Sequence, residues 1–193
     1  IHGRSGGVES DRQYAQNLRN LLKEHNENAV AAEVAYYIAS LYYDQGEANS
    51  DPNHEARWHW RTADSLCLIY IEKFPNSIGA RNCKSLSERI RMKDWGMDAE
   101  KAVLPDKPFR FLLNYRNLDE NSQKTWPVYV EVASIDPLKY REESRQSYGE
   151  KRIQWLQKNS QTVAKTSFNV PNPGDFREHR IELPLEGLPI GTY

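Results

Sequence analysis

The spacing of apolar residues changes once along the chain, and this change constrains the fold more than any other feature of the sequence. Up to about Met92 the apolar residues recur every three or four positions, which is typical of amphipathic helices. From Phe109 onward they alternate with polar residues, which is typical of strands. We therefore expect two domains, a helical one over residues 1–96 and a β domain over residues 97–193.

Four helices are expected in the first half, at residues 11–24, 27–45, 54–74 and 78–92. The third carries an unbroken apolar stripe at spacings of four and three: Ala56, Trp60, Ala63, Cys67, Tyr70 and Phe74. The Pro-Asn-Ser turn that follows ends this helix and offers an N-cap to the next. Short connections of this kind predict antiparallel hairpins. The junction resembles that of tetratricopeptide-like repeats, although self-similarity near about 34 residues is weak, so a plain four-helix bundle is the alternative.

Strands are expected at residues 109–115, 126–132, 162–170 and 181–185, preceded by an extended stretch at 97–103. The charged segment 138–157 interrupts the series and is expected to be a helical insertion. Several short strands separated by turn signals indicate an antiparallel β-sandwich. The expected fold class is therefore α+β.

The charge balance narrows the classes of partner. The net charge is −1, and no basic stripe is present, so we expect no nucleic-acid partner and no binding to anionic membranes. No apolar run approaches the ~18 residues that span a bilayer, so no direct membrane insertion is expected. Five Trp, eleven Tyr and five Phe supply apolar surface, which indicates a folded chain rather than a disordered one.

The histidines give no metal-binding pattern. His54 and His59 flank a glutamate as in a zinc-protease helix, but they are five residues apart, whereas that motif needs two histidines four apart. His2, His25 and His179 fall in separate elements. The run Gly3-Arg4-Ser5-Gly6-Gly7 has the spacing of a Gly-x-Ser-x-Gly nucleophile motif, but the sequence offers no strand before it that would strain the serine, and a Cys-x-x-Cys pair is missing. We expect no catalytic, cofactor-binding or metal-binding residue, and no enzymatic activity.

The two cysteines have a spacing that places them together. Cys67 lies eight residues before Pro75, and Cys83 lies eight residues after it. In an antiparallel hairpin that turns at Pro75 both reach the same level on inward stripes. The small residues Ala63 and Gly79 allow the Cα separation below about 7 Å that a disulfide needs. We predict a disulfide between Cys67 and Cys83, and two buried thiols are the alternative.

Three aromatic residues lie off the apolar stripes of the helices. Tyr36, Tyr43 and Trp58 form a candidate binding surface for a sugar or a peptide. Packing against a third helix is the more common arrangement for such residues, and it is the alternative.

Several segments resemble, in order, the first domains of bacterial α2-macroglobulin-like proteins. The runs PNPGDFREHRIELP at 171–184 and LPIGTY at 188–193 resemble the first macroglobulin-type domain, where a Pro-x-x-Gly-Asp-aromatic-x-x-His turn leads into a strand and Leu-Pro-x-Gly-x-Tyr opens the next. The run PFRFLLNYRNL at 108–118 looks like an early strand of that domain, and FPNSIGARNC at 74–83 looks like a helical extension that precedes it in some members. The resemblance is firmest over residues 105–193.

This resemblance implies tetratricopeptide-like hairpins followed by a macroglobulin- or fibronectin-like β-sandwich that is truncated at its C-terminal end. It implies a non-catalytic scaffold or docking part of a bacterial protease inhibitor that traps its target after cleavage of a bait segment. The implied partners are downstream domains of the same chain and the target proteases. The implied location is periplasmic, secreted or on the cell surface, with any membrane tether in a segment that this sequence does not contain.

Two other classes fit the sequence. One is a tetratricopeptide-like binding module of an outer-membrane glycan-uptake system. The other is an accessory domain of an enzyme whose active site lies outside these residues.

Overall fold

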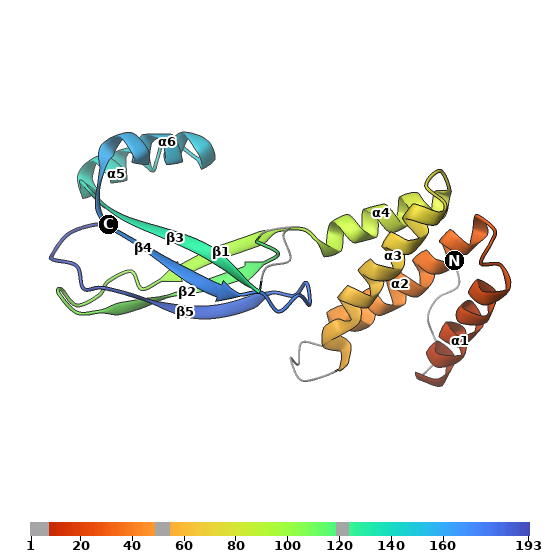
Figure 1. The fold of residues 1–193 in the computed structure, drawn as a ribbon. Coiled ribbons are helices and arrows are strands. Elements are labelled where there is room, and N and C mark those ends of the chain that lie inside the picture. Colours follow the sequence, from red (N-terminus) through yellow and green to blue (C-terminus); the bar gives the residue numbers. More distant parts are fainter. Residues whose placement is uncertain (1–7, 49–54, 119–123) are drawn as a thin grey trace. The chain divides into compact units, whose positions relative to one another are not determined.

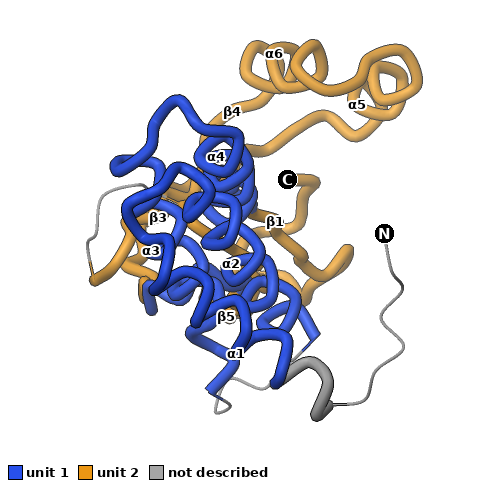
Figure 2. The backbone as a smooth tube through the Cα atoms, turned by 90° about the vertical axis from the view of Figure 1, so that its right-hand side faces the viewer, with its two compact units in different colours: residues 1–94, 173–178 blue, residues 95–172, 179–193 orange. Residues whose placement is uncertain are grey.

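The computed structural model describes residues 8–48, 55–118 and 124–193. Within these ranges the protein is of mixed α+β type, with six α-helices and two small antiparallel sheets (Figure 1). The coarse α+β prediction is therefore confirmed. The chain divides into two compact units, which Figure 2 distinguishes by colour. Unit 1 comprises residues 1–94 and 173–178, and unit 2 comprises residues 95–172 and 179–193. Whether 1–96 and 97–193 fold independently stays a prediction.

Unit 1 contains all four predicted helices. They are α1 (Val8–Glu24), α2 (Val30–Ala48), α3 (His59–Lys73) and α4 (Ile78–Ile90), and a short 3-10 helix, η1 (Glu55–Trp58), leads into α3. The predicted cap is present at the start of α4, where the Ser77 hydroxyl oxygen accepts a hydrogen bond from the Ala80 N–H at 3.0 Å. His54, the predicted start of the third helix, lies outside the described residues.

The buried face of α3 is the predicted one. Ala56, Trp60, Ala63, Cys67 and Tyr70 are all buried. The apolar residues Val30 and Tyr37 of α2 do not lie on its buried face, because each is 52% exposed. Small residues take the inner positions instead: Ala31, Ala32, Ala35 and Ala39, together with Val34 and Ile38.

A close approach of two backbones explains this choice of small residues. A methyl group added at Gly79 of α4 would lie 2.2 Å from the main chain of Ala32 in α2. Such a distance leaves no room for any side chain at Gly79, and it requires a small residue on the facing turn of α2. The contact between α2 and α4 therefore selects the alanine face of α2 over the face that carries Val30 and Tyr37.

The described residues of unit 2 form five strands, β1 (Asp94–Ala99), β2 (Phe109–Arg116), β3 (Thr125–Ile135), β4 (Ser160–Pro171) and β5 (His179–Leu185). One sheet has the order β1-β2-β5, and the other pairs β3 with β4. The helices α5 (Pro137–Glu143) and α6 (Gly149–Asn159) lie between β3 and β4 in sequence, at the end of that ribbon (Figure 1). They confirm the predicted helical insertion, and the strands confirm the predicted alternation.

Both sheets of unit 2 contribute to one apolar cluster. Its buried members are Phe111, Leu113, Tyr115, Trp126, Val170 and Leu183. Phe111 of β2 lies opposite Leu183 of β5, and Trp126 of β3 lies opposite Val170 of β4. The Tyr115 ring meets the Trp126 ring edge-on at a centroid distance of 6.0 Å. The inward-facing side chains of the two sheets therefore share a single core.

Residues 188–193 form no regular strand. Whether Leu-Pro-x-Gly-x-Tyr opens a strand stays a prediction. Tyr193 is 42% exposed, and its hydroxyl donates to the Pro189 carbonyl at 2.9 Å. This bond closes a turn around Gly191. The Thr192 carbonyl accepts a hydrogen bond from the Ile135 N–H at 2.9 Å, so this segment runs beside the end of β3.

Candidate functional site

Two of the three candidate binding residues pack against the core of unit 1. Tyr36 and Tyr43 are half-buried and lie against the same apolar cluster. The Tyr43 ring stacks on the Trp60 ring at a centroid distance of 5.3 Å and an angle of 7°. The Trp60 indole N–H donates to the Tyr43 carbonyl at 3.0 Å, which fixes the stack. These contacts correspond to the alternative that such aromatic residues pack against a neighbouring helix.

Trp58 has a different environment. It is 42% exposed and lines a shallow groove of about 530 Å³ on the surface of η1 and α3. The groove residues are Trp58, Arg61, Thr62, Ser65, Leu66 and Ile69. The guanidinium groups of Arg57 and Arg61 lie 5.2 and 5.9 Å from the centre of the Trp58 ring. Trp58 therefore lies beside the guanidinium of Arg61 and near the hydroxyls of Thr62 and Ser65. Tyr36 and Tyr43 pack against the core cluster instead.

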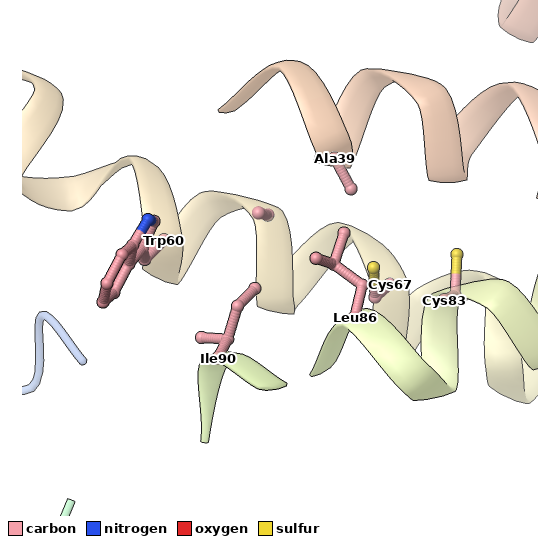
Figure 3. Packing of buried hydrophobic residues seen from close by; sticks show 7 residues of the cluster. Ala39, Trp60, Cys67, Cys83, Leu86 and Ile90 are labelled. Atoms are coloured by element: carbon pink, nitrogen blue, oxygen red, sulfur yellow. The ribbon is translucent and has the colours of Figure 1, made fainter. Parts of the chain in front are cut away.

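The two cysteines lie on facing helices in the core of unit 1. Cys67 comes from α3 and Cys83 from α4, and both are fully buried (Figure 3). Both are free thiols, and the Cys83 thiol donates to the Ala32 carbonyl of α2 at 3.8 Å. The neighbouring Cys83 thiol, followed by burial, raises the pKa of Cys67 far above its usual value, and the neighbouring Cys67 thiol lowers the pKa of Cys83. The predicted disulfide stays a prediction for an oxidising compartment.

A buried carboxylate, which the sequence analysis missed, joins α3 to the end of α4. Asp64 is 2% exposed and receives two hydrogen bonds from the Arg91 guanidinium, at 2.9 Å from Nε and 2.6 Å from Nη2. The Ser87 hydroxyl donates to the same carboxylate at 2.6 Å. This fork geometry gives a strong, oriented ion pair. The partners are 23 and 27 residues from Asp64, so no local pattern reveals them.

A second buried carboxylate lies in the segment 173–178, which the sequence analysis treated as a turn between strands. Asp175 is 1% exposed and accepts hydrogen bonds from Arg57 Nε at 2.8 Å and from the Arg177 N–H at 3.1 Å. The Arg177 side chain donates to the Ala56 carbonyl at 3.4 Å, and its guanidinium lies 5.4 Å from the centre of the Trp60 ring. The segment therefore completes unit 1 from a distant part of the sequence.

The adjacent aromatic residue takes part in the same arrangement. Phe176 adopts a left-handed backbone conformation, with φ of 61°, and packs against the core cluster of unit 1. The Arg91 guanidinium, which also holds Asp64, lies 5.5 Å from the centre of the Phe176 ring. The residues Gly174, Asp175 and Phe176 therefore have structural roles in unit 1. Gly174 has a positive φ of 71°. Asp175 accepts a hydrogen bond from Arg57, and the Phe176 ring lies beside the Arg91 guanidinium.

The described histidines belong to separate elements or loops. The His59 ring meets the Tyr42 ring edge-on at 5.1 Å, and the His179 ring lies 5.8 Å from that of Tyr115. His2 and His54 lie outside the described residues. Over residues 8–48, 55–118 and 124–193, no three His, Cys, Asp or Glu side chains gather in a way that would hold a metal ion. Among the helices in those ranges, none combines the length and the apolar character needed to cross a bilayer.

Comparison with models of known protein families, with curated proteins and with solved structures finds no match to this chain. The family resemblance therefore depends on the motifs themselves and on where the structure places them.

Proposed function

We propose that this chain is the non-catalytic scaffold and docking part of a bacterial α2-macroglobulin-like protein that traps proteases. In this proposal unit 1 is the tetratricopeptide-like extension, and unit 2 is the first macroglobulin-type β-sandwich. The observation that carries the proposal is the core of unit 2. Its buried members Phe111, Leu113 and Tyr115 come from residues 108–118, and Leu183 comes from residues 171–184. Both segments resemble parts of the first macroglobulin-type domain.

The sandwich assignment is supported by the way in which the two sheets share that core. Inward side chains of β2 and β5 meet inward side chains of β3 and β4 in one cluster, as they do when two sheets pack face to face. The Tyr115 hydroxyl donates to the Pro171 carbonyl at 2.9 Å and ties β2 to the end of β4. The tetratricopeptide-like assignment is supported by the α3–α4 hairpin and by its small inward residues.

A trapping assay on the full product of the gene tests this proposal. The protein is incubated with a broad-specificity protease, and its cleavage sites, its compactness and the remaining protease activity are measured. Cleavage in one exposed segment, compaction, and loss of activity on large but not on small substrates are expected. The 193-residue chain alone is the control and should leave both activities unchanged. Progressive degradation of the full product without compaction would refute the proposal.

One observation favours the glycan-binding alternative, namely the groove beside Trp58. An exposed indole next to hydroxyl and guanidinium groups is suited to stacking on a sugar ring and to hydrogen bonding with its hydroxyls. Titration with oligosaccharides, followed by tryptophan fluorescence, tests it. If the groove binds the sugar, Trp58→Ala should abolish the fluorescence change on titration. Trp95→Ala, at a residue of unit 2 that is 70% exposed, is the matched control and should keep that change. Binding that depends on Trp58, without a trapping response, would favour the alternative.

A further inference from the structure

Two features of unit 1 that lie far apart in the sequence share one core, namely the thiol pair and the segment 173–178. Cys67 and Cys83 adjoin each other between α3 and α4 (Figure 3). Phe176 packs against the same cluster, although its segment lies between β4 and β5 in the sequence. We call residues 173–178 the latch, because they pack within unit 1. Since protein cores are close-packed, a change at the thiols can alter the packing of the latch.

One turn further along both helices, a second contact joins α3 to α4. Asp64 precedes Cys67 by three residues in α3. Ser87 follows Cys83 by four residues in α4. The Ser87 hydroxyl donates to the Asp64 carboxylate at 2.6 Å, so the two side chains meet next to the thiols. A movement of α3 against α4 at the thiols therefore also displaces Asp64 relative to Ser87.

Arg91 extends this row of contacts to the latch. Its guanidinium donates two hydrogen bonds to the Asp64 carboxylate, at 2.9 and 2.6 Å, and lies 5.5 Å from the centre of the Phe176 ring. The Arg91 N–H donates to the Ser87 carbonyl at 2.9 Å, which ties its backbone to the last turn of α4. A displacement of Asp64 against α4 therefore changes the position of the cation that supports Phe176.

A disulfide between Cys67 and Cys83 requires such a displacement. A sulfur–sulfur bond of about 2.05 Å is much shorter than a contact between two unbonded sulfur atoms. The Cys83 thiol also has to leave the Ala32 carbonyl, to which it donates at 3.8 Å. A methyl group at Gly79 of α4 would lie 2.2 Å from the main chain of Ala32, so α4 has no room to move toward α2. Much of the adjustment therefore falls on α3 and on Asp64.

The docked latch is strained, so a small change can release it. Phe176 has a φ of 61°, which is an unfavourable conformation for a residue with a bulky side chain. The contacts that offset this strain include the ion pair between Arg57 and Asp175 at 2.8 Å and the Arg91 guanidinium beside the Phe176 ring. Weakening the second of these contacts favours release of Phe176 from the core.

We propose that Cys67 and Cys83 form a redox switch that controls the latch. The latch is docked while both thiols are free, and it is loosened when they form a disulfide. The latch is followed directly by β5 at His179 and is preceded by β4, which ends at Pro171. The switch therefore acts on the loop that joins these two strands. This inference does not depend on protease trapping.

The oxidant is a small disulfide such as oxidised glutathione. One cysteine thiolate attacks a sulfur atom of the oxidant, which forms a mixed disulfide and releases one glutathione thiolate. The other cysteine thiolate then attacks the mixed disulfide, which forms the bond between Cys67 and Cys83 and releases the second glutathione thiolate. The two protons of the cysteine thiols pass to the released thiolates, and the oxidant gains the two electrons.

Amide hydrogen exchange of the whole chain in two redox states tests the proposal. The chain is refolded in reducing or oxidising glutathione buffer, and peptide mapping confirms the state of the cysteines. The Arg177 amide reports on the latch, because its N–H donates to the Asp175 carboxylate at 3.1 Å. Oxidation should speed its exchange by about tenfold, a common strength of coupling between two sites. A disulfide that only stabilised the fold would slow exchange instead, so faster exchange is specific to the switch.

Two controls accompany this measurement. The variant with both cysteines changed to serine should exchange at the same rate in both buffers. The amides of β3 that bond to β4 belong to unit 2 and should not respond to the redox state.

Thermodynamic linkage gives a second test with a different readout. If the disulfide loosens the latch, then a weaker latch must favour the disulfide, because one coupling free energy connects the two equilibria. Asp175→Asn removes the charge that Arg57 binds, so it should raise the equilibrium constant for disulfide formation against glutathione several-fold. Phe176→Leu, a milder change that removes the ring beside Arg91, should act in the same direction. Glu27→Gln, at an exposed ion pair, is the matched control and should leave this constant unchanged.

Three outcomes would overturn the proposal. Cys67 and Cys83 stay free thiols after refolding in the oxidising buffer. The Arg177 amide exchanges at the same rate or more slowly in the oxidised chain. Finally, both latch variants fold, as circular dichroism shows, but leave the equilibrium constant for the disulfide unchanged.

Discussion

At the residue scale, two buried carboxylates, Asp64 and Asp175, link distant parts of unit 1. Asp64 is held by Arg91 and Ser87, and the side chain of Arg91 is 45% exposed. We expect Asp64→Asn to lower the free energy of unfolding by about 2 kcal/mol, because the Arg91 guanidinium and the Ser87 hydroxyl lose the carboxylate to which they donate. Chemical denaturation measures this. Glu27→Gln, which breaks an ion pair whose carboxylate is 88% exposed, is the control and should cost below about 0.5 kcal/mol. Equal effects would contradict the role of Asp64.

Cys67 and Cys83 give a second test at this scale. Their thiols meet in the core, so in protein matured outside the cytoplasm we expect them to form a disulfide. Closing a loop of about 17 residues would stabilise the fold by about 3 kcal/mol. Peptide mapping without reductant identifies the bridge, and the variant with both cysteines changed to serine measures its contribution. Two free thiols in secreted protein would contradict the disulfide and the proposed location.

At the scale of elements, the helices α5 and α6 form a side structure of the β3–β4 ribbon. They contribute no residue to the apolar cluster of unit 2, and the main stabilising contacts of Arg152 go to the Ser144 and Ser147 carbonyls within the insertion itself. Ile135 and Ser160, which flank the insertion, lie opposite each other in the ladder.

Replacing residues 135–160 by Asn-Gly, which joins the opposed residues Ser134 and Gln161, should therefore leave unit 2 folded. Such a dipeptide closes an antiparallel pair through a tight turn. We expect the midpoint of thermal unfolding to change by only a few degrees, about the effect of 1 kcal/mol in a domain of this size. A matched deletion of β5, which carries the buried Leu183, should prevent folding. Unfolding of the shortened chain would show that the insertion supports the sheets.

At the scale of the whole molecule, the connection between the units is expected to be the most accessible backbone. Lys93, Lys101 and Lys107 are exposed and lie at or near the boundary that follows Asp94. Brief treatment with trypsin should cut first at these lysines and leave two resistant pieces. Mass spectrometry of the early fragments checks this. First cuts within residues 54–92 would contradict the boundary.

Unit 1 is discontinuous in sequence, which leads to another prediction at this scale. A fragment of residues 1–94 lacks the segment that carries Asp175 and Phe176, so Arg57 loses its carboxylate and the core cluster loses an aromatic ring. We expect the fragment to unfold at a lower temperature than unit 1 does in the whole chain. A synthetic peptide of residues 171–180 should raise its midpoint, and the same peptide with Asp175→Asn should have a smaller effect. Equal effects of both peptides would contradict the role of Asp175.

The sequence alone determined the type and order of the elements. Side-chain periods of 3.6 in a helix and 2 in a strand follow from backbone geometry, so the stripe of α3 and the alternation of Phe111, Leu113 and Tyr115 could be predicted. Counting outward from Pro75 likewise placed Cys67 beside Cys83, because both lie on one local hairpin. In each case the relevant partners are set by the chain's own local geometry.

Tertiary structure alone decided which face of α2 is buried and which polar residues form the inner network. The apolar character of Val30 and Tyr37 could not reveal that Gly79 brings α4 against the alanine side of α2. Asp175 and Arg57 are 118 residues apart, and neither stands in a pattern that marks it as buried. Interactions between distant segments depend on where the folded chain brings them together. The local period of apolar residues reflects only the backbone geometry of one element, so it cannot predict these interactions.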